Sequence, residues 1–292
     1  MKIEKIPLKE RRSVVFLGRG QVSVKDGSMV FHKGDKNAEK ISIPAGGTAC
    51  LMLEPGTRIS HSAVKLAARQ NCMVVWVGEG GVRMYATAFT SDHAGPQIML
   101  QSYLASNSRA RLEVVKKMFE IRFNEELPEF DSVRKIRGFE GARVRDKYNC
   151  LALKYGIDWS GRVYNVPWNK MDLPNYCLCV AAACLNAISE AAIRTAGYSP
   201  AIGFMHRGDS RSFVFDIADL FKFDFVVPVA FKVASQAPSR PESRVRHMCR
   251  DRFREFKFLK KIIPTIKEVL KVGVPYINIP EGEEKKWHRW IN

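Results

Sequence analysis

Short apolar runs separated by turn residues fill the first ninety positions, a pattern typical of β-strands. The runs occupy residues 13–17, 21–25, 28–32, 39–44, 48–53, 72–77 and 82–87. Asp26-Gly27 joins two of them with a sequence that favours a tight hairpin. Ser60 suits the N-cap of one short helix, with Ala63 and Ala67 on its apolar face. We therefore predict a small β-sandwich with one helix over residues 1–90.

Beyond a linker at residues 91–96, the apolar positions recur with the helical period of 3.6. The second predicted helix is strongly amphipathic, with Met118, Phe119 and Arg122 along its apolar face. Helices are expected at residues 97–107, 108–124, 133–155 with a break near 138–141, 176–196, 242–258 and 260–271. The fold class is α+β, an N-terminal β-sandwich-like domain followed by a larger all-α domain. The helical domain spans residues 97–275, and an irregular tail covers 276–292.

The charge balance of the 292 residues is strongly basic. Lys and Arg number 47 against 30 Asp and Glu, which gives a formal net charge of +17. An excess of this size favours a polyanionic partner, most often nucleic acid, although it also occurs in proteins that are merely soluble and basic. A hydrophobic fraction of 46% with 26% charged residues describes an ordinary folded protein.

Neither a signal peptide nor a membrane span is expected. Residues 1–7 alternate Lys and Glu with Ile, and the longest apolar stretch, at residues 176–188, is too short to cross a bilayer. The seven cysteines follow no disulfide or zinc spacing, which indicates free thiols in a reducing compartment. We expect a soluble, cytoplasmic protein.

Residues 199–224 carry the first candidate chemistry. A Gly/Pro-rich loop holds His206, and the apolar run after it holds Asp216 and Asp219. If residues 213–222 are helical, the two acids share one face. Acids among Phe, Val and Ile are costly unless a cation or hydrogen bonds compensate them, so a metal site is one interpretation. Helix caps or ion-paired acids explain the same pattern equally well.

Glu140 is the second candidate acid, in an arginine-rich segment at residues 133–147. Gly138 and Gly141 flank it and permit a close approach by a ligand. A solvated helix face on which the glutamate pairs with an arginine accounts for it as well. Together with His206 and the two aspartates, Glu140 would form an oxygen-rich site with one imidazole, suited to Mg²⁺ or Mn²⁺ and to phosphodiester chemistry.

Two further features fit a nucleic-acid partner. Five cations at helical spacing form a basic stripe: Arg246, Arg250, Arg254, Lys257 and Lys261. Such a stripe beside an apolar one predicts a helix with one face in the core and one face free for phosphates. Tyr164 and Trp168 lie on a predicted loop, where aromatic rings either stack on unpaired bases or pack on the core.

Longer motifs at these positions resemble a known family. They are Arg-Gly-Phe-Glu-Gly-Ala-Arg-Val-Arg at residues 137–145, Ala-Ile-Gly-Phe-Met-His at 201–206 and Phe-Val-Phe-Asp-Ile-Ala-Asp at 213–219. Segments at residues 52–61 and 75–83 resemble it too. The family is the CRISPR-associated integrase/endonuclease of the adaptation module (the Cas-one family), in its I-E subtype. The likeness covers nearly the whole chain, from residue 6 to about residue 270.

The resemblance implies a metal-dependent DNA endonuclease/integrase of spacer acquisition, an antiviral defence. A homodimer is implied, with two dimers bridged by a dimer of a small CRISPR-associated partner, the Cas-two protein. The assembly would capture double-stranded DNA with single-stranded 3′ overhangs and insert each 3′-OH into the CRISPR repeat beside the leader by transesterification. Glu140, His206 and Asp219 would bind Mg²⁺ or Mn²⁺, and Asp216 would be a further essential acid.

The resemblance also assigns DNA contacts. Tyr164 and Trp168 would read the protospacer-adjacent motif in the overhang, and Arg19 stands where the family has a tyrosine wedge. The remaining contacts are Arg58, Lys65, Arg83, Arg246 and Arg250. Two rival functions are a non-catalytic basic DNA-binding scaffold of the same assembly and a metallohydrolase of small phosphate esters. The second of these would not need the basic stripe.

Overall fold

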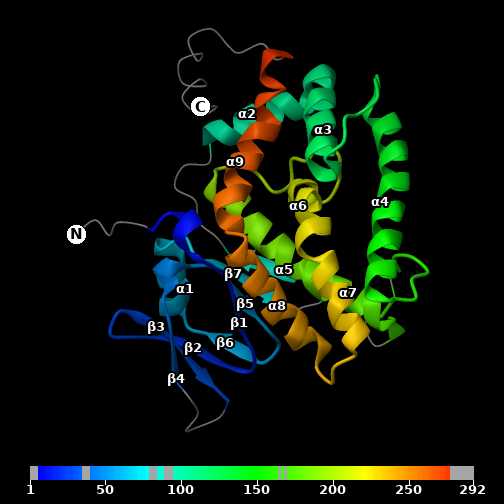
Figure 1. Ribbon diagram of the computed structural model, residues 1–292. Helices are drawn as coiled ribbons and strands as arrows, with labels where there is room; N and C mark the ends of the chain where they lie inside the picture. The colour runs from blue at the N-terminus through cyan, green and yellow to red at the C-terminus, as the bar shows by residue number, and fades with distance from the viewer. Residues whose placement is uncertain are drawn as a thin grey trace.

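The computed structural model describes residues 6–34, 40–78, 84–88, 95–163, 166–167 and 170–276. A β-rich N-terminal part is followed by a larger helical part, with the strands gathered at one side of the molecule and the helices beside and above them (Figure 1). The predicted α+β fold class is therefore confirmed. The domain limits at residues 90, 97 and 275 stay a prediction.

Two four-stranded sheets make up the described N-terminal part. The first has the order β1-β5-β7-β8, with β1, β5 and β7 parallel and β8 antiparallel; the second has the order β4-β3-β2-β6. Their bounds are β1 Arg12–Leu17, β2 Gly20–Lys25, β3 Ser28–Lys33, β4 Lys40–Ile43, β5 Thr48–Leu53, β6 Thr57–Ile59, β7 Met73–Val77 and β8 Met84–Ala88. The predicted strands are found, and the hairpin at Asp26-Gly27 joins β2 to β3 with both residues at positive φ.

Strand β6 was not expected, because three residues are too few to show a period. It pairs parallel to β2, and the Thr57 hydroxyl donates to the carbonyl of Gly18 at 2.6 Å. Helix α1, His61–Arg69, begins as predicted: the Ser60 hydroxyl accepts a hydrogen bond from the N–H of Ala63 at 3.2 Å.

The two faces of the first sheet belong to different cores. Leu51, Leu53 and Val74 point to a core shared with the second sheet and α1. Met52 and Val75, on the opposite face, are fully buried in the core of the helical part. A sheet buried on both faces explains why β5 and β7 are continuous apolar runs without alternation.

The helical part contains α2 Gly95–Ser106, α3 Ser108–Phe123, α4 Val133–Tyr155, α5 Leu173–Thr195, α6 Ser212–Phe225, α7 Val227–Gln236, α8 Pro241–Glu255 and α9 Phe258–Lys271. Helix α2 begins at Gly95, inside the predicted linker, of which residues 91–94 lie outside the described residues. The tail also lies outside them from residue 277 on.

Two predicted boundaries are wrong. Helix α4 runs without the expected break at residues 138–141, because Gly138 and Gly141 keep helical geometry and cost only propensity. The helix expected over residues 242–258 instead ends at Glu255, where Lys257 adopts a left-handed conformation with φ 49°. The basic stripe therefore bends between α8 and α9. Helix α7 was missed because it follows α6 almost without a gap and has Pro228 in its first turn, a residue that usually marks a break in a helical pattern.

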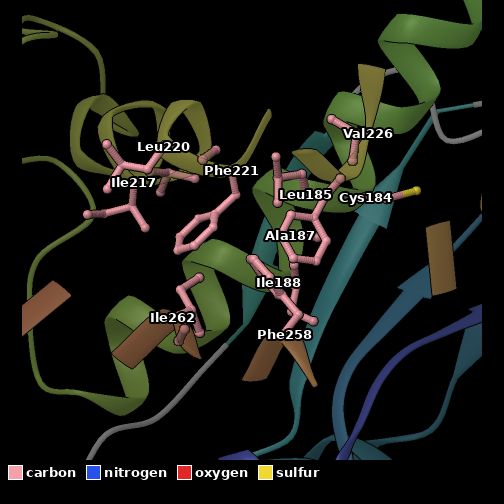
Figure 2. Packing of buried hydrophobic residues seen from close by; sticks show 14 of the residues in the cluster. Cys184, Leu185, Ala187, Ile188, Ile217, Leu220, Phe221, Val226, Phe258 and Ile262 are labelled. Atoms are coloured by element: carbon pink, nitrogen blue, oxygen red, sulfur yellow. The ribbon is translucent and has the colours of Figure 1, made fainter. Parts of the chain in front are cut away.

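Helix α5 is the centre of the helical core. Its Leu185 and Ile188 lie beside Phe221 of α6 and Phe258 of α9 in one buried cluster, and the side chain of Cys184 points away from these rings (Figure 2). With 23 residues and a mean hydropathy of 1.7 it is long and apolar enough to cross a membrane, contrary to the sequence expectation. However, 78% of its most apolar stretch is buried inside the protein, so α5 acts as a core helix.

Candidate active site

A loop before α6 and the first turns of α6 form one side of the site. Asp216 accepts backbone hydrogen bonds from Phe204 at 2.6 Å, Met205 at 3.2 Å and His206 at 2.8 Å. Its side chain is 0% exposed. Gly203 is needed in this loop, because an added Cβ would collide with the His206 carbonyl. The backbone of this loop therefore wraps around the carboxylate of Asp216.

Asp216 also fixes the imidazole of His206. Nδ1 of the ring lies 2.8 Å from Oδ1 of Asp216, and the side chain of His206 is 36% exposed. Engaging Nδ1 leaves Nε2 as the nitrogen for an outside ligand. A carboxylate that orients a histidine in this way is a common support for a metal-binding imidazole. This geometry favours a role for Asp216 in orienting His206.

Two side chains, one from α2 and one from α3, form hydrogen bonds with the backbone of the same loop. The amide of Gln101 donates to the carbonyls of Ser199 and Ile202 at 3.0 and 2.7 Å and accepts from the Ser199 N–H at 2.8 Å. Arg111 donates through Nε to the carbonyl of Phe204 at 2.8 Å. His206 is thus positioned by elements distant in sequence, and neither Gln101 nor Arg111 was singled out from the sequence.

Arg122, near the end of α3, binds both remaining candidate acids. One terminal nitrogen pairs with Glu140 of α4, and the other lies 3.1 Å from Oδ2 of Asp219 of α6. The Arg122 side chain is only 7% exposed, and its Nε is buried without a hydrogen-bond partner. The sequence had placed this arginine on the apolar face of its helix. An arginine on the apolar face of a helix is itself a sign of a buried ion-pair partner, because a buried charge is costly without one.

Asp219 lies between two cations. Its other oxygen is 3.3 Å from Nζ of Lys222, one turn further along α6. Burial alone would raise the pKa of the Asp219 carboxyl, but Arg122 and Lys222 outweigh it and lower the pKa to about 2. For Lys222, burial would lower the pKa, but the charge of Asp219 outweighs it and raises the pKa. The acid is therefore ionised at every physiological pH.

All four candidate residues line one small cavity, so the predicted grouping is brought together in space. The cavity has a volume of about 20 Å³ and an apolar lining of Met118, Phe119, Met205 and Leu220. It is lined by Glu140, His206, Asp216 and Asp219, with Arg122 among them. Room of this size suits a water molecule or a single ion rather than a small organic ester.

The donor types fit a hard divalent cation, but the present arrangement is not a finished metal site. Glu140 and Asp219 offer carboxylate oxygens and His206 offers Nε2, the set that suits Mg²⁺ or Mn²⁺. Within the described ranges, no three His, Cys, Asp or Glu side chains lie close enough together to hold a metal as they stand. Arg122 supplies the positive charge between the two acids instead. The ion-pair alternative considered for these acids is thus what the structure contains.

The predicted DNA-contacting residues fall into three groups. Arg58 on β6, Lys65 on α1 and Arg19 before β2 are exposed on neighbouring elements of the second sheet. Arg83, Tyr164 and Trp168 lie outside the described residues. The third group is the basic stripe on α8 and α9.

Within that stripe, Arg246 and Arg250 differ. Arg246 is 12% exposed, pairs with Glu54 after β5 and lies 5.3 Å above the ring of Phe16. Burial lowers the pKa of Arg246, and the pair ties α8 to the strands. Arg250 is 48% exposed beside Asp251 and lines a cavity of about 730 Å³ between β1 and the α8–α9 turn. The arginine and lysine residues that line this cavity are Arg11, Arg250, Arg254, Lys257 and Lys260, and Glu10 and His247 line it as well.

Comparison with known proteins gives the same assignment along nearly the whole chain. The family model for CRISPR associated protein Cas1 matches residues 120–244. The CRISPR-associated endonuclease Cas1 of Geobacter sulfurreducens is 49% identical over 282 residues, covering 96% of this chain and 92% of that protein. The CRISPR-associated endonuclease Cas1 of Escherichia coli K12 is 50% identical over 269 residues, covering 92% and 88%.

Solved structures agree with these matches. The crystal structure of the TtCas1-DNA complex superposes with a TM-score of 0.79 at 33% identity, covering 92% of this chain and 93% of that one. A casposase bound to an integration product, at 14% identity and a TM-score of 0.70, shares the fold. Identity near one half over nine-tenths of the chain means that this protein belongs to the Cas1 family of CRISPR-associated proteins.

Proposed function

We propose that this chain is a metal-dependent DNA endonuclease/integrase of CRISPR spacer acquisition. It takes double-stranded DNA with single-stranded 3′ overhangs and inserts the 3′-OH ends into the CRISPR repeat by transesterification. The relatives at 49% and 50% identity are named endonucleases, and one similar structure is a complex with DNA. The observation that carries the proposal is the convergence of Glu140, His206 and Asp219 on one cavity, with Asp216 holding the imidazole.

Glu140, His206 and Asp219 would hold the ion. A bound Mg²⁺ or Mn²⁺ supplies positive charge to a phosphoryl oxygen and makes an attacking hydroxyl more acidic. The protein supplies the rest. Asp216 keeps Nδ1 of His206 engaged, so that Nε2 faces the cavity. Gln101 and Arg111 keep the loop backbone in place.

The basic surfaces would bind the DNA backbone. The net charge of +17 attracts a polyanion, and the cavity beside Arg250 is lined by five arginine and lysine side chains, from the segment before β1, from α8 and α9 and from the turn between these helices. Arg58, Lys65 and Arg19 would extend this DNA contact over the second sheet. For Arg83 we propose a further DNA contact. Tyr164 and Trp168 would read the protospacer-adjacent motif in the overhang. For Arg246 we propose a mainly structural role in the ion pair with Glu54, and DNA contact as a second role.

The partner follows from the same assignment. A Cas6-RT-Cas1–Cas2 complex shares the fold at 13% identity and a TM-score of 0.66. We propose that this chain forms homodimers in the cytoplasm, and that two of them are bridged by a dimer of the small Cas2-type protein. Sedimentation of the mixed proteins tests this stoichiometry. A single species of four copies of this chain and two of the partner is expected.

The deciding experiment is integration of a labelled duplex into a plasmid that carries a CRISPR repeat. It is run with Mn²⁺, Mg²⁺ or EDTA, and with and without the small partner protein. Covalent joining that needs a divalent ion supports the proposal. Joining that continues in EDTA contradicts the metal role. Salt-sensitive DNA binding without any joining favours the rival, a non-catalytic DNA scaffold, for which the ion pairs of Arg122 are the supporting observation.

A further inference from the structure

Arg122 lies between the two candidate acids Glu140 and Asp219, the position that a bound metal cation would also take. Its guanidinium contacts Glu140 through one terminal nitrogen and Asp219 through the other, so a single positive group spans the two acids. The acids come from α4 and α6, and the arginine comes from α3. Three helices therefore meet at this one ion-pair cluster.

The charges of the cluster are already balanced. Arg122 and Lys222 carry two positive charges, and Glu140 and Asp219 carry two negative ones. Asp216 adds one negative charge, but it is turned toward three backbone N–H groups and His206. A divalent ion placed beside Arg122 would leave four positive charges facing these acids in a buried setting, which is strongly unfavourable. One cation has to leave before another can enter.

Arg122, rather than Lys222, is the cation whose place a divalent ion would take, because it alone spans both carboxylates. Its Nε is buried without a partner, so its hydrogen-bonding capacity is incompletely satisfied where it stands. The faces of Phe123 and Phe223, 5.3 and 5.7 Å from the guanidinium carbon, give weak support to the charge. Lys222, by contrast, lies on the same helix as its acid, one turn away, and does not span the two carboxylates.

We propose that Arg122 is an internal counter-ion that competes with the divalent metal for Glu140 and Asp219. Metal binding and release of Arg122 are then one coupled event, and the arginine sets the metal affinity of the site. This inference rests on the metal site of the proposed function. Without metal, the same arginine holds two half-buried like charges together and stabilises the contact of α3 with α4 and α6.

Mn²⁺ binding to the full-length protein, measured by isothermal titration calorimetry, tests the competition. Arg122→Gln removes the charge and is expected to tighten Mn²⁺ binding at least about tenfold, because nothing has to be displaced. Arg122→Lys keeps a charge that cannot span both acids, so it is expected to fold and to bind Mn²⁺ a few-fold more tightly than the wild type. Thermal unfolding in EDTA gives the second readout: both variants are expected to melt at a lower temperature than the wild type.

Arg143→Gln is the matched control. Arg143 of α4 pairs with Glu125 at 2.9 Å, also across the α3–α4 junction but outside the cavity. Its loss is expected to leave Mn²⁺ affinity unchanged. Glu140→Gln identifies the site, because it is expected to abolish the measured binding.

The outcomes separate the two proposals. Mn²⁺ binding that Glu140→Gln abolishes but that neither Arg122 variant tightens would overturn the competition and leave the metal site standing. Mn²⁺ binding that Glu140→Gln leaves unchanged would overturn the metal site and the role of Arg122 with it. Tighter binding in both variants, together with lower melting temperatures in EDTA, supports the inference.

Discussion

Asp216 and His206 are joined twice, since the same carboxylate oxygen accepts the backbone N–H of His206 and the ring at Nδ1, both at 2.8 Å. The backbone bond fixes where the residue is, and the ring bond fixes which way it faces. Because the carboxylate is fully buried, it reaches no substrate itself. One acid thus holds both the backbone and the ring of His206.

Replacing Asp216 by Asn tests this relationship. One N–H donor or more in the loop would lose its acceptor, so the free energy of unfolding is expected to fall by about 2 kcal/mol or more. Mn²⁺ affinity is expected to fall by about 10- to 100-fold as His206 loses its support. Urea denaturation and calorimetry measure the two effects. Asp224→Asn, at an exposed position near the end of α6, is the control and is expected to change neither. Unchanged affinity in Asp216→Asn would contradict the positioning role.

Removing the proposed ligands separates chemistry from binding. His206→Ala and Asp219→Ala are each expected to abolish strand transfer to a repeat-bearing plasmid, because the site then lacks a donor. DNA affinity, measured by fluorescence anisotropy, is expected to stay within about twofold, since the phosphate contacts lie elsewhere. Integration at the wild-type rate in either variant would refute the ligand assignment.

The pH dependence of stability follows from Asp219. Its pKa is about 2 in the folded protein, below the ordinary value of 3.8, so the unfolded chain takes up a proton first as the pH falls. The acid therefore contributes about 2 kcal/mol of stability at neutral pH, and about half of this is lost by about pH 3. Urea denaturation in EDTA is expected to show the difference between wild type and Asp219→Asn shrinking over this range. A difference that is constant with pH would contradict the paired state of the carboxylate.

Arg246 and Arg250, one turn apart on α8, are expected to behave differently. Arg246→Ala breaks the half-buried pair with Glu54 and is expected to lower the free energy of unfolding by about 2 kcal/mol, less than the loss of a fully buried pair. Arg250→Ala removes an exposed cation and is expected to change stability by less than about 0.5 kcal/mol.

For DNA binding, we expect the larger effect from the loss of Arg250 and the smaller effect from the loss of Arg246. Arg250→Ala is expected to reduce the slope of log affinity against log salt by about one unit, the effect of one lost phosphate contact. Stability and anisotropy measurements on the same preparations check both effects. An unaltered salt slope in Arg250→Ala would exclude it as a phosphate contact.

Apolar periodicity, or a continuous apolar run, predicted most of the elements, because most of them bury one face and the central strands β5 and β7 bury both. The strands of the N-terminal part and helices α3, α6 and α8 all gave clear patterns, and the Ser60 cap appeared where its side chain suggested. Two elements were missed. Strand β6 has only three residues, too few to show a period, and α7 has ten and follows α6 directly, with Pro228 in its first turn.

The site was only half predictable. Glu140, His206, Asp216 and Asp219 were identified as a group, and the cavity brings them together. The contacts that distinguish these four side chains from one another are made between different helices, and the spacing of residues along one helix does not predict such contacts. Arg122 pairs with acids 18 residues and 97 residues further along the chain, and only the packing of α3 against α4 and α6 reveals it.

The sheet β1-β5-β7-β8 has a consequence for how the protein is made. Its outer face, with Met52 and Val75, is completed only by the helices that follow. At about 5–20 residues per second, translation leaves that apolar face uncovered for several seconds before α5 emerges from the ribosome. A truncated chain that ends before α5 would leave this apolar face exposed to water, so we expect the two sheets without the helices to be less stable and more prone to aggregate.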